Sequence, residues 1–352
     1  MRAASALSTH PTTATALGEA AGQVLEALGG ARPALALVTV TPPHLGTLED
    51  VGVALGALLA PDVVIGAVSS AVVGGGSHVR GVPALALFAV AGVAASPLSL
   101  MAEGGAPLRR SGGLDGATAA VVLADPFSCP GSALLDALAD PPAGGGLVDA
   151  GQGPGGSRLL LDGSVRTSGA VGALLGPPCR ALASQGAIPV GAPWVVTRAD
   201  GDLLLELGGR PAAERGAEAL GADARPAAVG LALDEQAEEP GRADLLAVSV
   251  EGAAPGGGLR LARAVQVGWV VRFLRTGPVE AEADLGAVLS QHGPAPSGVL
   301  LFPAAGRAGD AGLVTELLGC PTGGVGVSAA LGPVRGAPAL HGAGATGLIV
   351  FP

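Results

Sequence analysis

Residues 297–351 read SGVLLFPAAGRAGDAGLVTELLGCPTGGVGVSAALGPVRGAPALHGAGATGLIVF. The apolar run at residues 299–302 predicts a buried strand, and a glycine loop follows it at residues 306–309. We expect Asp310 to cap a short helix, after which a second strand and a closing hairpin complete the segment. This order of elements is typical of an α/β fold. The apolar face of the helix is expected to bury Leu313, Leu317 and Leu318.

The same order of elements occurs twice more upstream. A strand at residues 35–40 precedes a helix that Thr47 and Asp50 are expected to cap, and a strand at residues 119–124 precedes a helix after Pro130. Three segments of about sixty residues suggest mixed sheets built from one repeated β-α-β-β unit. A supersecondary pattern common to many folds would give the same likeness, so the sequence leaves both explanations open. The inner face of the first helix is expected to carry Leu48, Val51, Leu55 and Leu58.

The chain of 352 residues is long enough for two domains. An alanine-rich helix is expected within residues 1–30. Residues 201–274 differ from the repeated segments, because they alternate short apolar runs with turns, as antiparallel strands do. We therefore expect a first domain over residues 31–210 and a second over residues 211–352.

The charge and the residue usage exclude several functions. A net charge of −10 repels nucleic acid, and the absence of lysine excludes a P-loop lysine or Schiff-base chemistry. The histidines and cysteines show no metal-ligand spacing, so we predict no enzyme, no metal and no cofactor. The cysteines are odd in number and far apart, which indicates a reducing cytoplasm: Cys129, Cys179 and Cys320.

Residues 81–102 carry no charge over the length of a membrane span. Pro83, Pro97 and several glycines interrupt this stretch, so we predict strands and turns here and no membrane span. The first residues lack the apolar region of a signal peptide, which again predicts a cytoplasmic protein.

Several motifs resemble one family. SQGAIPVG at residues 184–191 is followed by LLLELGGRPA at residues 203–212, and FPAAGR at residues 302–307 precedes LGPVR and LHG within residues 331–342. Together with DVVIGAVSS at residues 62–70, these motifs resemble the FIST family from about residue 30 to the C-terminus. The resemblance implies a cytoplasmic bacterial sensory protein with an N-terminal and a C-terminal FIST domain, which binds small ligands such as amino acids in signal transduction. It also implies haem binding as an alternative, because some members are taken to be haem-binding gas sensors.

The sequence departs from the family where the family is polar. Small apolar residues stand at Ala187-Ile188, Ala304-Ala305, Ala329-Ala330 and Ala343-Gly344. A ligand, if the site retains one, should therefore be smaller or more apolar than is usual for the family. The same losses favour an alternative function, a degenerate scaffold for protein–protein interaction.

Candidate ligand contacts lie mostly in loops that follow the predicted strands, where open α/β sheets bind their ligands. Arg307 is the strongest candidate, because a guanidinium between glycines can hold a carboxylate; the alternative is an internal salt bridge. His341 could contact a ligand or fix the closing hairpin through the backbone. Cys129 precedes a helix but reads better as a small buried residue. The full set of expected ligand contacts is Arg307, His341, Ser69, Ser70, His44, Gln185, Gly306 and Ser328. The expected partners are an amino-acid-like small molecule and a signalling protein.

Overall fold

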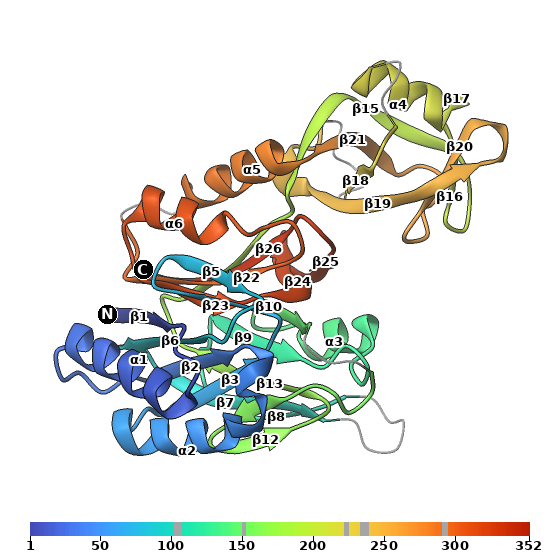
Figure 1. Ribbon diagram of the computed structural model, residues 1–352. Helices are drawn as coiled ribbons and strands as arrows, with labels where there is room; N and C mark the ends of the chain where they lie inside the picture. The colour runs from blue at the N-terminus through green and yellow to red at the C-terminus, as the bar shows by residue number, and fades with distance from the viewer. Residues whose placement is uncertain (102–107, 150–152, 222–224, 233–238, 291–294) are drawn as a thin grey trace. The chain divides into compact units, whose positions relative to one another are not determined.

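The computed structural model describes residues 1–101, 108–149, 153–221, 225–232, 239–290 and 295–352. Contacts divide these residues into two compact units, of which unit 1 comprises Met1–Ser184 with Leu285–Pro352 and unit 2 comprises Gln185–Asp284. Helices and mixed parallel and antiparallel sheets make the fold α/β, as the sequence predicts (Figure 1). The expected domain boundaries near residues 30 and 210 do not coincide with these units and stay a prediction.

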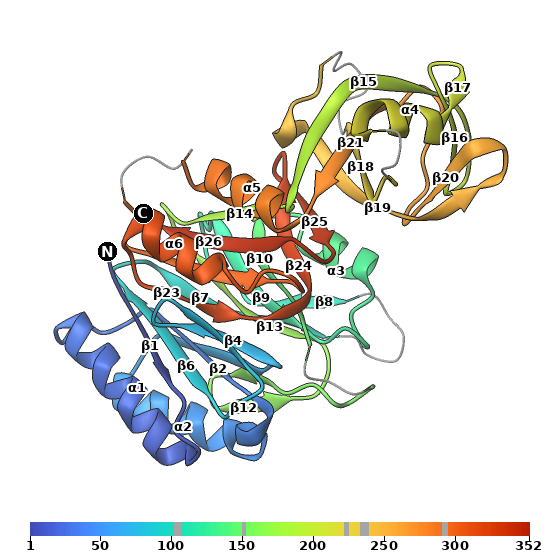
Figure 2. The same cartoon turned by 45° about the horizontal axis from the view of Figure 1, so that its top comes forward.

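The first sheet of unit 1 is formed mainly by continuous apolar runs, which suit strands buried on both faces. Helices α1 (Thr13–Leu28) and α2 (Leu48–Leu59), with the short 3-10 helix η1 (Pro42–Thr47), pack on one face of this sheet (Figures 1 and 2). Its strands in spatial order are β1 (Arg2–Ser8), β6 (Leu85–Ala91), β2 (Leu35–Val40), β3 (Val63–Val68), β11 (Leu159–Leu161) and β12 (Ser164–Arg166).

The second sheet of unit 1 joins distant parts of the chain, since β10 pairs with β24. Helix α3 (Gly131–Ala137) packs on it through Leu134. Its strands in order are β25 (Ala337–His341), β24 (Val327–Val334), β10 (Ala143–Val148), β9 (Ala119–Ala124), β13 (Ala170–Leu175), β7 (Ala95–Met101) and β8 (Arg109–Ser111).

The third sheet of unit 1 also combines both ends of the chain, because β23 pairs with β4. Helix α6 (Asp310–Leu318) and the last residues of α5 (Pro278–Ser290) pack on it. Its strands in order are β14 (Arg180–Ser184), β26 (Thr346–Phe351), β22 (Gly298–Pro303), β23 (Thr322–Val325), β4 (Ala71–Gly74) and β5 (Ser77–Arg80).

The three sheets share one apolar interior. Phe88 of β6 and Phe351 of β26 meet there with ring centroids 5.5 Å apart, among buried aliphatic side chains from all three sheets. The hydroxyl of Ser297 donates to the carbonyl oxygens of Met1 and Pro352, so the two termini lie side by side in this unit (Figure 1). Unit 1 therefore folds as one body from sequence segments that are far apart.

Three segments of unit 1 share one topology. In each, a helix connects two parallel strands, β2 with β3, β9 with β10 and β22 with β23, and a later strand pairs antiparallel with the first. Gly145 of β10 and Gly324 of β23 both have φ +148°, and a Cβ at either would lie 1.8 Å from a carbonyl oxygen of the neighbouring strand. Reuse of one unit stays a prediction, but the described strands have the order that it requires.

Unit 2 contains an antiparallel sheet that closes on itself, because β15 pairs with both β21 and β16. Helix α4 (Ala212–Leu220) contacts this sheet, and two 3-10 turns, η2 (Arg242–Asp244) and η3 (Pro255–Gly257), lie between its strands. The strands in order are β15 (Ala187–Asp200), β21 (Val270–Thr276), β18 (Ala228–Ala232), β19 (Leu245–Ala254), β20 (Gly258–Leu261), β16 (Leu203–Leu207) and β17 (Arg210–Pro211).

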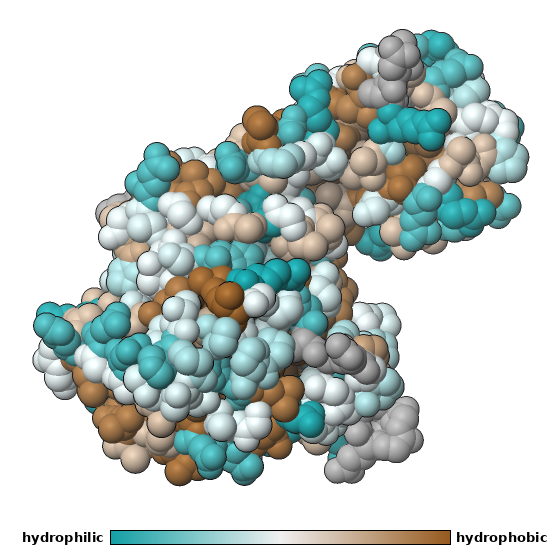
Figure 3. Space-filling model, in the orientation of Figure 1, coloured by the Kyte–Doolittle hydropathy of each residue, from teal (hydrophilic) through white to brown (hydrophobic). Residues whose placement is uncertain are grey.

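Some local predictions are wrong. Thr47 does not cap α2 through its side chain, because its hydroxyl donates to the carbonyl oxygen of His44, and Asp310 lies inside α6 rather than capping it. Leu58 and Leu317 are both 51% exposed. Each predicted inner face, that of α2 and that of α6, therefore contains one residue that lies at the surface instead. Figure 3 shows hydrophobic residues on the outer surface over α1 and α2.

The uncharged stretch from residue 81 to residue 101 forms the strands β6 and β7, as predicted; residue 102 lies outside the described residues. None of the described helices is both long and apolar enough to cross a membrane.

Candidate functional site

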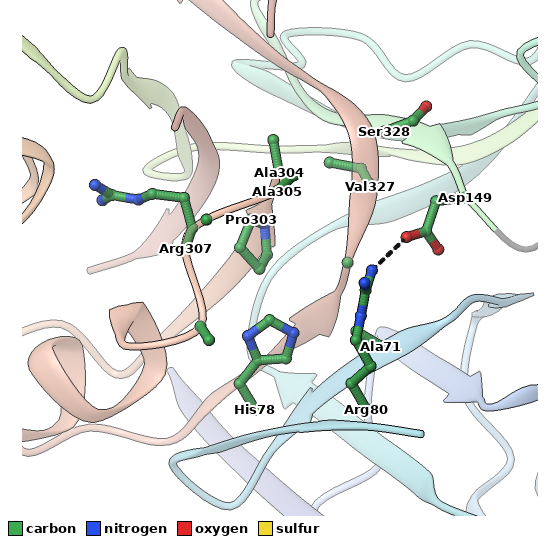
Figure 4. Close-up of a pocket in the computed structure, with 13 residues that line it drawn as sticks. Ala71, His78, Arg80, Asp149, Pro303, Ala304, Ala305, Arg307, Val327 and Ser328 are labelled. Carbon is green, nitrogen blue, oxygen red and sulfur yellow. Dashed lines mark hydrogen bonds and ion pairs between the residues drawn. The ribbon is translucent and has the colours of Figure 1, made fainter. Parts of the chain in front are cut away.

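A cavity of about 460 Å³ lies in unit 1 where four separate chain segments meet. The loop at residues 303–308, strand β5 and the start of β24 form most of its wall (Figure 4). This position agrees with the general rule that ligands bind beyond the carboxyl ends of parallel strands, because the loop directly follows β22. Most of the wall is apolar; the charged or polar side chains that line it belong to His78, Arg80, Asp149 and Ser328, and Arg307 contributes to the wall as part of the loop.

The loop at residues 303–308 is held by backbone hydrogen bonds. The amide of Ala304 donates to the carbonyl oxygen of Ala345 at 2.9 Å, which ties the loop to the approach to β26. Gly306 has φ +88°, a conformation that favours glycine, and lets the chain turn toward α6. The sequence correctly places Gly306 in a glycine loop at the end of a strand, and the structure places it in the cavity wall.

The side chain of Arg307 lies on the other side of this loop. Figure 4 shows it pointing away from His78 and Arg80. Its Nε donates to the carboxylate of Asp310 at 2.8 Å and to the hydroxyl of Thr346 at 3.2 Å, and the side chain is 1% exposed. Nη1 and Nη2 are buried and have no hydrogen-bond partner among the described residues. The ion pair with Asp310 is the internal salt bridge that the sequence left open as the alternative role of Arg307. Contact of Arg307 with a ligand stays a prediction.

Burial raises the pKa of Asp310, and this effect outweighs the opposing attraction of Arg307 and the hydrogen bond from Thr346. The buried carboxyl group is thus poorly suited to carry its charge. Asp310, which was predicted to cap α6, therefore forms a buried ion pair with Arg307 instead. This pair fixes the loop against α6 and β26.

A network around Asp149 forms one side of the cavity. The carboxylate of Asp149 accepts hydrogen bonds from the hydroxyls of Ser69 (2.6 Å) and Ser70 (2.5 Å) and from the amide of Ser70 (2.8 Å). The Nη2 of Arg80 donates to Asp149 at 2.9 Å and to the Ser70 hydroxyl at 2.6 Å. The Ser69 hydroxyl also bonds to the carbonyl oxygen of Gly326. The two predicted serines therefore position the charged residues that line the cavity.

The Arg80 side chain is 63% exposed, whereas that of Asp149 is 15% exposed. Nε and Nη1 of Arg80 make no hydrogen bond to any described residue, so the guanidinium retains free donors at the cavity. The exposed guanidinium of Arg80 is therefore available to a ligand.

His78 lies between the loop and Arg80 (Figure 4). Both ring nitrogens are buried and have no hydrogen-bond partner within the described part of the chain. Burial is the main reason that the pKa of His78 is lowered, and the positive charge of Arg80 adds to it; the backbone near Ala308 and the carboxylate of Asp310 act in the opposite direction.

The other expected contacts lie outside this cavity or in its rim. Ser328 is exposed at the rim and donates to the carbonyl oxygen of Leu147. His44 is buried, bonds through Nδ1 to Thr13, and has a pKa lowered by burial. His341 bonds through Nε2 to the carbonyl oxygen of Gly332 within the β24–β25 hairpin, as its structural alternative supposes.

Gln185 belongs to unit 2. Its side-chain amide donates to the carbonyl oxygen of Leu245 and accepts from the amide of Ala247, both at 2.8 Å, and so holds the start of β19. Cys129 is buried, and burial raises the pKa of its thiol to about 11, which fits a small core residue.

Sequence reasoning missed His78, Arg80 and Asp149. His78 and Arg80 lie on β5, a strand of four residues for which the sequence made no prediction, and Asp149 follows β10. Alternating polar residues in Ser77–Arg80 were the available signal. Their role depends on the pairing of β4 with β23, which joins residues far apart in the sequence.

Comparison with known proteins agrees with the fold and the motifs. The family model for the FIST N domain matches residues 34–210. The chain is similar to the uncharacterized protein Rv0628c of Mycobacterium tuberculosis, with 33% identity over 97% of each chain. It is also similar to the uncharacterized protein Mb0898c of Mycobacterium bovis, with 32% identity over 97% of each chain. The chain therefore belongs to the FIST family of sensory signal-transduction domains.

Proposed function

We propose that this protein is a sensory module that binds a small carboxylate metabolite, such as an amino acid, in the cavity of unit 1. The observation that carries the proposal is an ion pair, Arg80 with Asp149, in the wall of an otherwise largely apolar cavity. A volume of about 460 Å³ is within the usual range for small-molecule sites.

The charges favour a zwitterion. Arg80 can bind a carboxylate through its Nε and Nη1 donors, which Asp149 does not use, and the negative charge of Asp149, whose oxygens already accept four hydrogen bonds, attracts an ammonium group. An α-amino acid carries both groups on one carbon, so it matches a cation and an anion that are 2.9 Å apart.

The rest of the wall favours a small aliphatic side chain. Ala71, Ala304, Ala305 and Val327 line the cavity and offer no polar side chain. Two of them, Ala304 and Ala305, occupy positions where the family pattern is polar, which supports a ligand that is more apolar than usual for the family. Burial of one additional methylene group favours binding by about 0.8 kcal/mol.

We further propose that the signal passes by contact to a partner protein in the cytoplasm. The family assignment supports signalling, and the free, buried state of Cys129, Cys179 and Cys320 supports a reducing compartment. The alternative of a scaffold for protein–protein interaction predicts a partner complex that no small ligand affects.

A thermal-shift screen with three matched probes tests the ligand class. L-valine carries both charged groups, isovalerate lacks the ammonium group and isobutylamine lacks the carboxylate. We expect L-valine to stabilise the protein most and isobutylamine least. At 100 times its dissociation constant, a ligand adds about 2.7 kcal/mol of stability, so the transition should shift by roughly 5–10 °C.

Arg80→Ala should weaken L-valine binding roughly 10- to 100-fold, the effect of losing a hydrogen bond to a charged group. Arg32→Ala is the matched control, because Arg32 is 66% exposed and is likewise paired with an aspartate, Asp62, at 2.7 Å. A flat screen across aliphatic, polar and acidic amino acids, together with a stable complex in pull-downs, would favour the scaffold. A Soret band after addition of haem would favour the haem alternative.

A further inference from the structure

His78 is a titratable group in the cavity wall whose ring nitrogens make no hydrogen bond of good geometry to any described residue, although the backbone of Ala308 and Arg307 lies close to the ring. Both ring nitrogens are buried, and neither has a hydrogen-bond partner in the described ranges. A neutral imidazole carries one N–H donor and one acceptor, and leaving such groups buried and unpaired is energetically unfavourable. Groups of this kind are often completed by a ligand or by water. A modest rotation of the ring about its soft second torsion would turn a nitrogen toward the cavity.

The charges around His78 disfavour a proton while the cavity holds no anion. Arg80 lies two residues along β5 and repels an imidazolium, whereas Asp310 of α6 attracts it. The carboxylate of Asp149 is engaged by Arg80, and the guanidinium of Arg307 is paired with Asp310 on the other side of the loop. Glu316, the other acidic residue of α6, is exposed. Burial and Arg80 together therefore keep the ring neutral near neutral pH.

A carboxylate in the cavity would reverse this balance. It would offset the positive charge of Arg80 and would supply an acceptor for an imidazolium N–H. We propose that His78 takes up one proton from solvent when a carboxylate binds beside Arg80, so that the affinity for the carboxylate rises as the pH falls. This inference rests on the proposed function, because it needs a carboxylate in this cavity. No covalent bond changes: the proton moves from water to a ring nitrogen and stays there while the ligand is bound.

The sign of the pH dependence follows from linkage. In the free protein the pKa of His78 is lowered from its ordinary value of 6.5, and a bound carboxylate raises it. Between these two values the bound state holds more protons than the free state, so the dissociation constant decreases as the pH falls, by up to about tenfold per pH unit. Below the pKa of the free protein the affinity becomes constant.

Isothermal titration with L-valine between about pH 5.5 and 8 tests the inference, because neither charged group of this probe titrates in that range. Titrations in buffers with different ionisation enthalpies would count the protons taken up. We expect tighter binding at low pH and an uptake of up to one proton per ligand. His78→Gln should abolish both the slope and the uptake, whereas His10→Gln, at a site outside the cavity, should change neither.

The outcomes separate the two proposals. Binding of L-valine with the same affinity at every pH would overturn the role of His78 and would leave the proposed function intact. Absence of binding at every pH, for L-valine and for isovalerate, would overturn both. If His78→Gln fails to fold, a carbon NMR titration of the His78 ring in the native protein decides the matter, because saturating L-valine must raise its pKa; an unchanged pKa would refute the inference.

Discussion

Arg307→Met should destabilise the protein at neutral pH and leave it nearly unaffected in acid. The substitution removes the cation beside Asp310 but retains an apolar side chain of similar length. Both side chains of the pair are almost fully buried, at 1% and 3% exposed. Without Arg307, the carboxyl group must either stay charged in an apolar surrounding or take up a proton.

The structure limits the size of this effect. Protonating a carboxyl group of ordinary pKa 3.8 at pH 7 costs about 4 kcal/mol, so the part of the loss that comes from the unpaired carboxylate cannot exceed that figure. Because burial already raises the pKa of Asp310 in the native protein, part of this cost is present before the substitution. We therefore expect the free energy of unfolding at pH 7 to fall by about 2–3 kcal/mol. This is at or below the lower end of the usual cost of breaking a buried ion pair.

The pH dependence follows from the raised pKa. A carboxyl group with a raised pKa in the folded state contributes stability that is fully present below its unfolded pKa, near 3.8, and is lost as the pH rises through the folded pKa. In Arg307→Met the pKa of Asp310 in the folded state is higher still. The variant therefore loses more stability than the native protein as the pH rises. Near pH 4 both proteins should be similarly stable.

Urea unfolding followed by circular dichroism at pH 4 and pH 7 measures the difference. The double variant Arg307→Met/Asp310→Asn has no buried charge at this point, and its amide can still bond to Thr346, so it should recover most of the loss at pH 7. Arg32→Met removes an exposed ion pair and should cost less than about 1 kcal/mol at either pH. An equal deficit at both pH values, or no recovery in the double variant, would refute the reasoning.

Three further substitutions or reactions test the fold. Gly324→Ala places a Cβ 1.8 Å from the carbonyl oxygen of Leu301 and should cost roughly 1–3 kcal/mol in urea unfolding, whereas Gly312→Ala, in an open helical position, should be neutral or stabilising; equal effects would contradict the close strand approach. Burial raises the pKa of Cys179 to about 12 and that of Cys129 to about 11, so a thiol reagent at pH 8 should label neither until urea unfolds the chain. Gln185→Leu removes two hydrogen bonds between the Gln185 side chain and the backbone of β19, and should lower the free energy of unfolding by about 1–2 kcal/mol. A negligible decrease would show that these bonds do not hold β19.

The buried strands were predictable because their sequence signal is local. The apolar runs LALVTV and AAVVLA are the strands β2 and β9 at the predicted residues, and each is buried along its whole length. Strands covered on both faces need no polar alternation, so length and flanking turn residues were sufficient.

The helix faces were harder to predict because α2 and α6 are apolar on more than one side. Leu58 and Leu317 fit a helical period as well as their buried neighbours do, and only the packing of the helix on the sheet decides which residue is covered. The caps failed for a related reason. The Thr47 hydroxyl donates to the carbonyl oxygen of His44, three residues earlier, and the Asp310 carboxylate pairs with Arg307, so neither side chain bonds to an amide at the start of its helix.

Several residues predicted as ligand contacts lie at the cavity, and their contact with a ligand stays a prediction. Ser69, Ser70, Gly306, Arg307 and Ser328 all lie in the cavity wall or bond to a residue that does. Their common signal is a position after a buried strand. The titratable residues His78 and Arg80 gave no such signal, because β5 reaches the cavity only through the pairing of β4 with β23, two strands separated by most of the chain.

This distribution of residues has a consequence for ligand choice. The charged groups of the cavity come from the segment around β5 and from Asp149, whereas the loop at residues 303–308 contributes mostly alanine, glycine and backbone. Substitutions at Ala304 and Ala305 should therefore change which aliphatic side chain is accepted without changing the requirement for a carboxylate. If the ligand instead bound mainly through Arg307, the same substitutions would weaken all carboxylates alike. Comparing L-alanine with L-valine as ligands of Ala305→Ser and Arg80→Ala would separate these cases, since only the first variant should change their ratio of affinities.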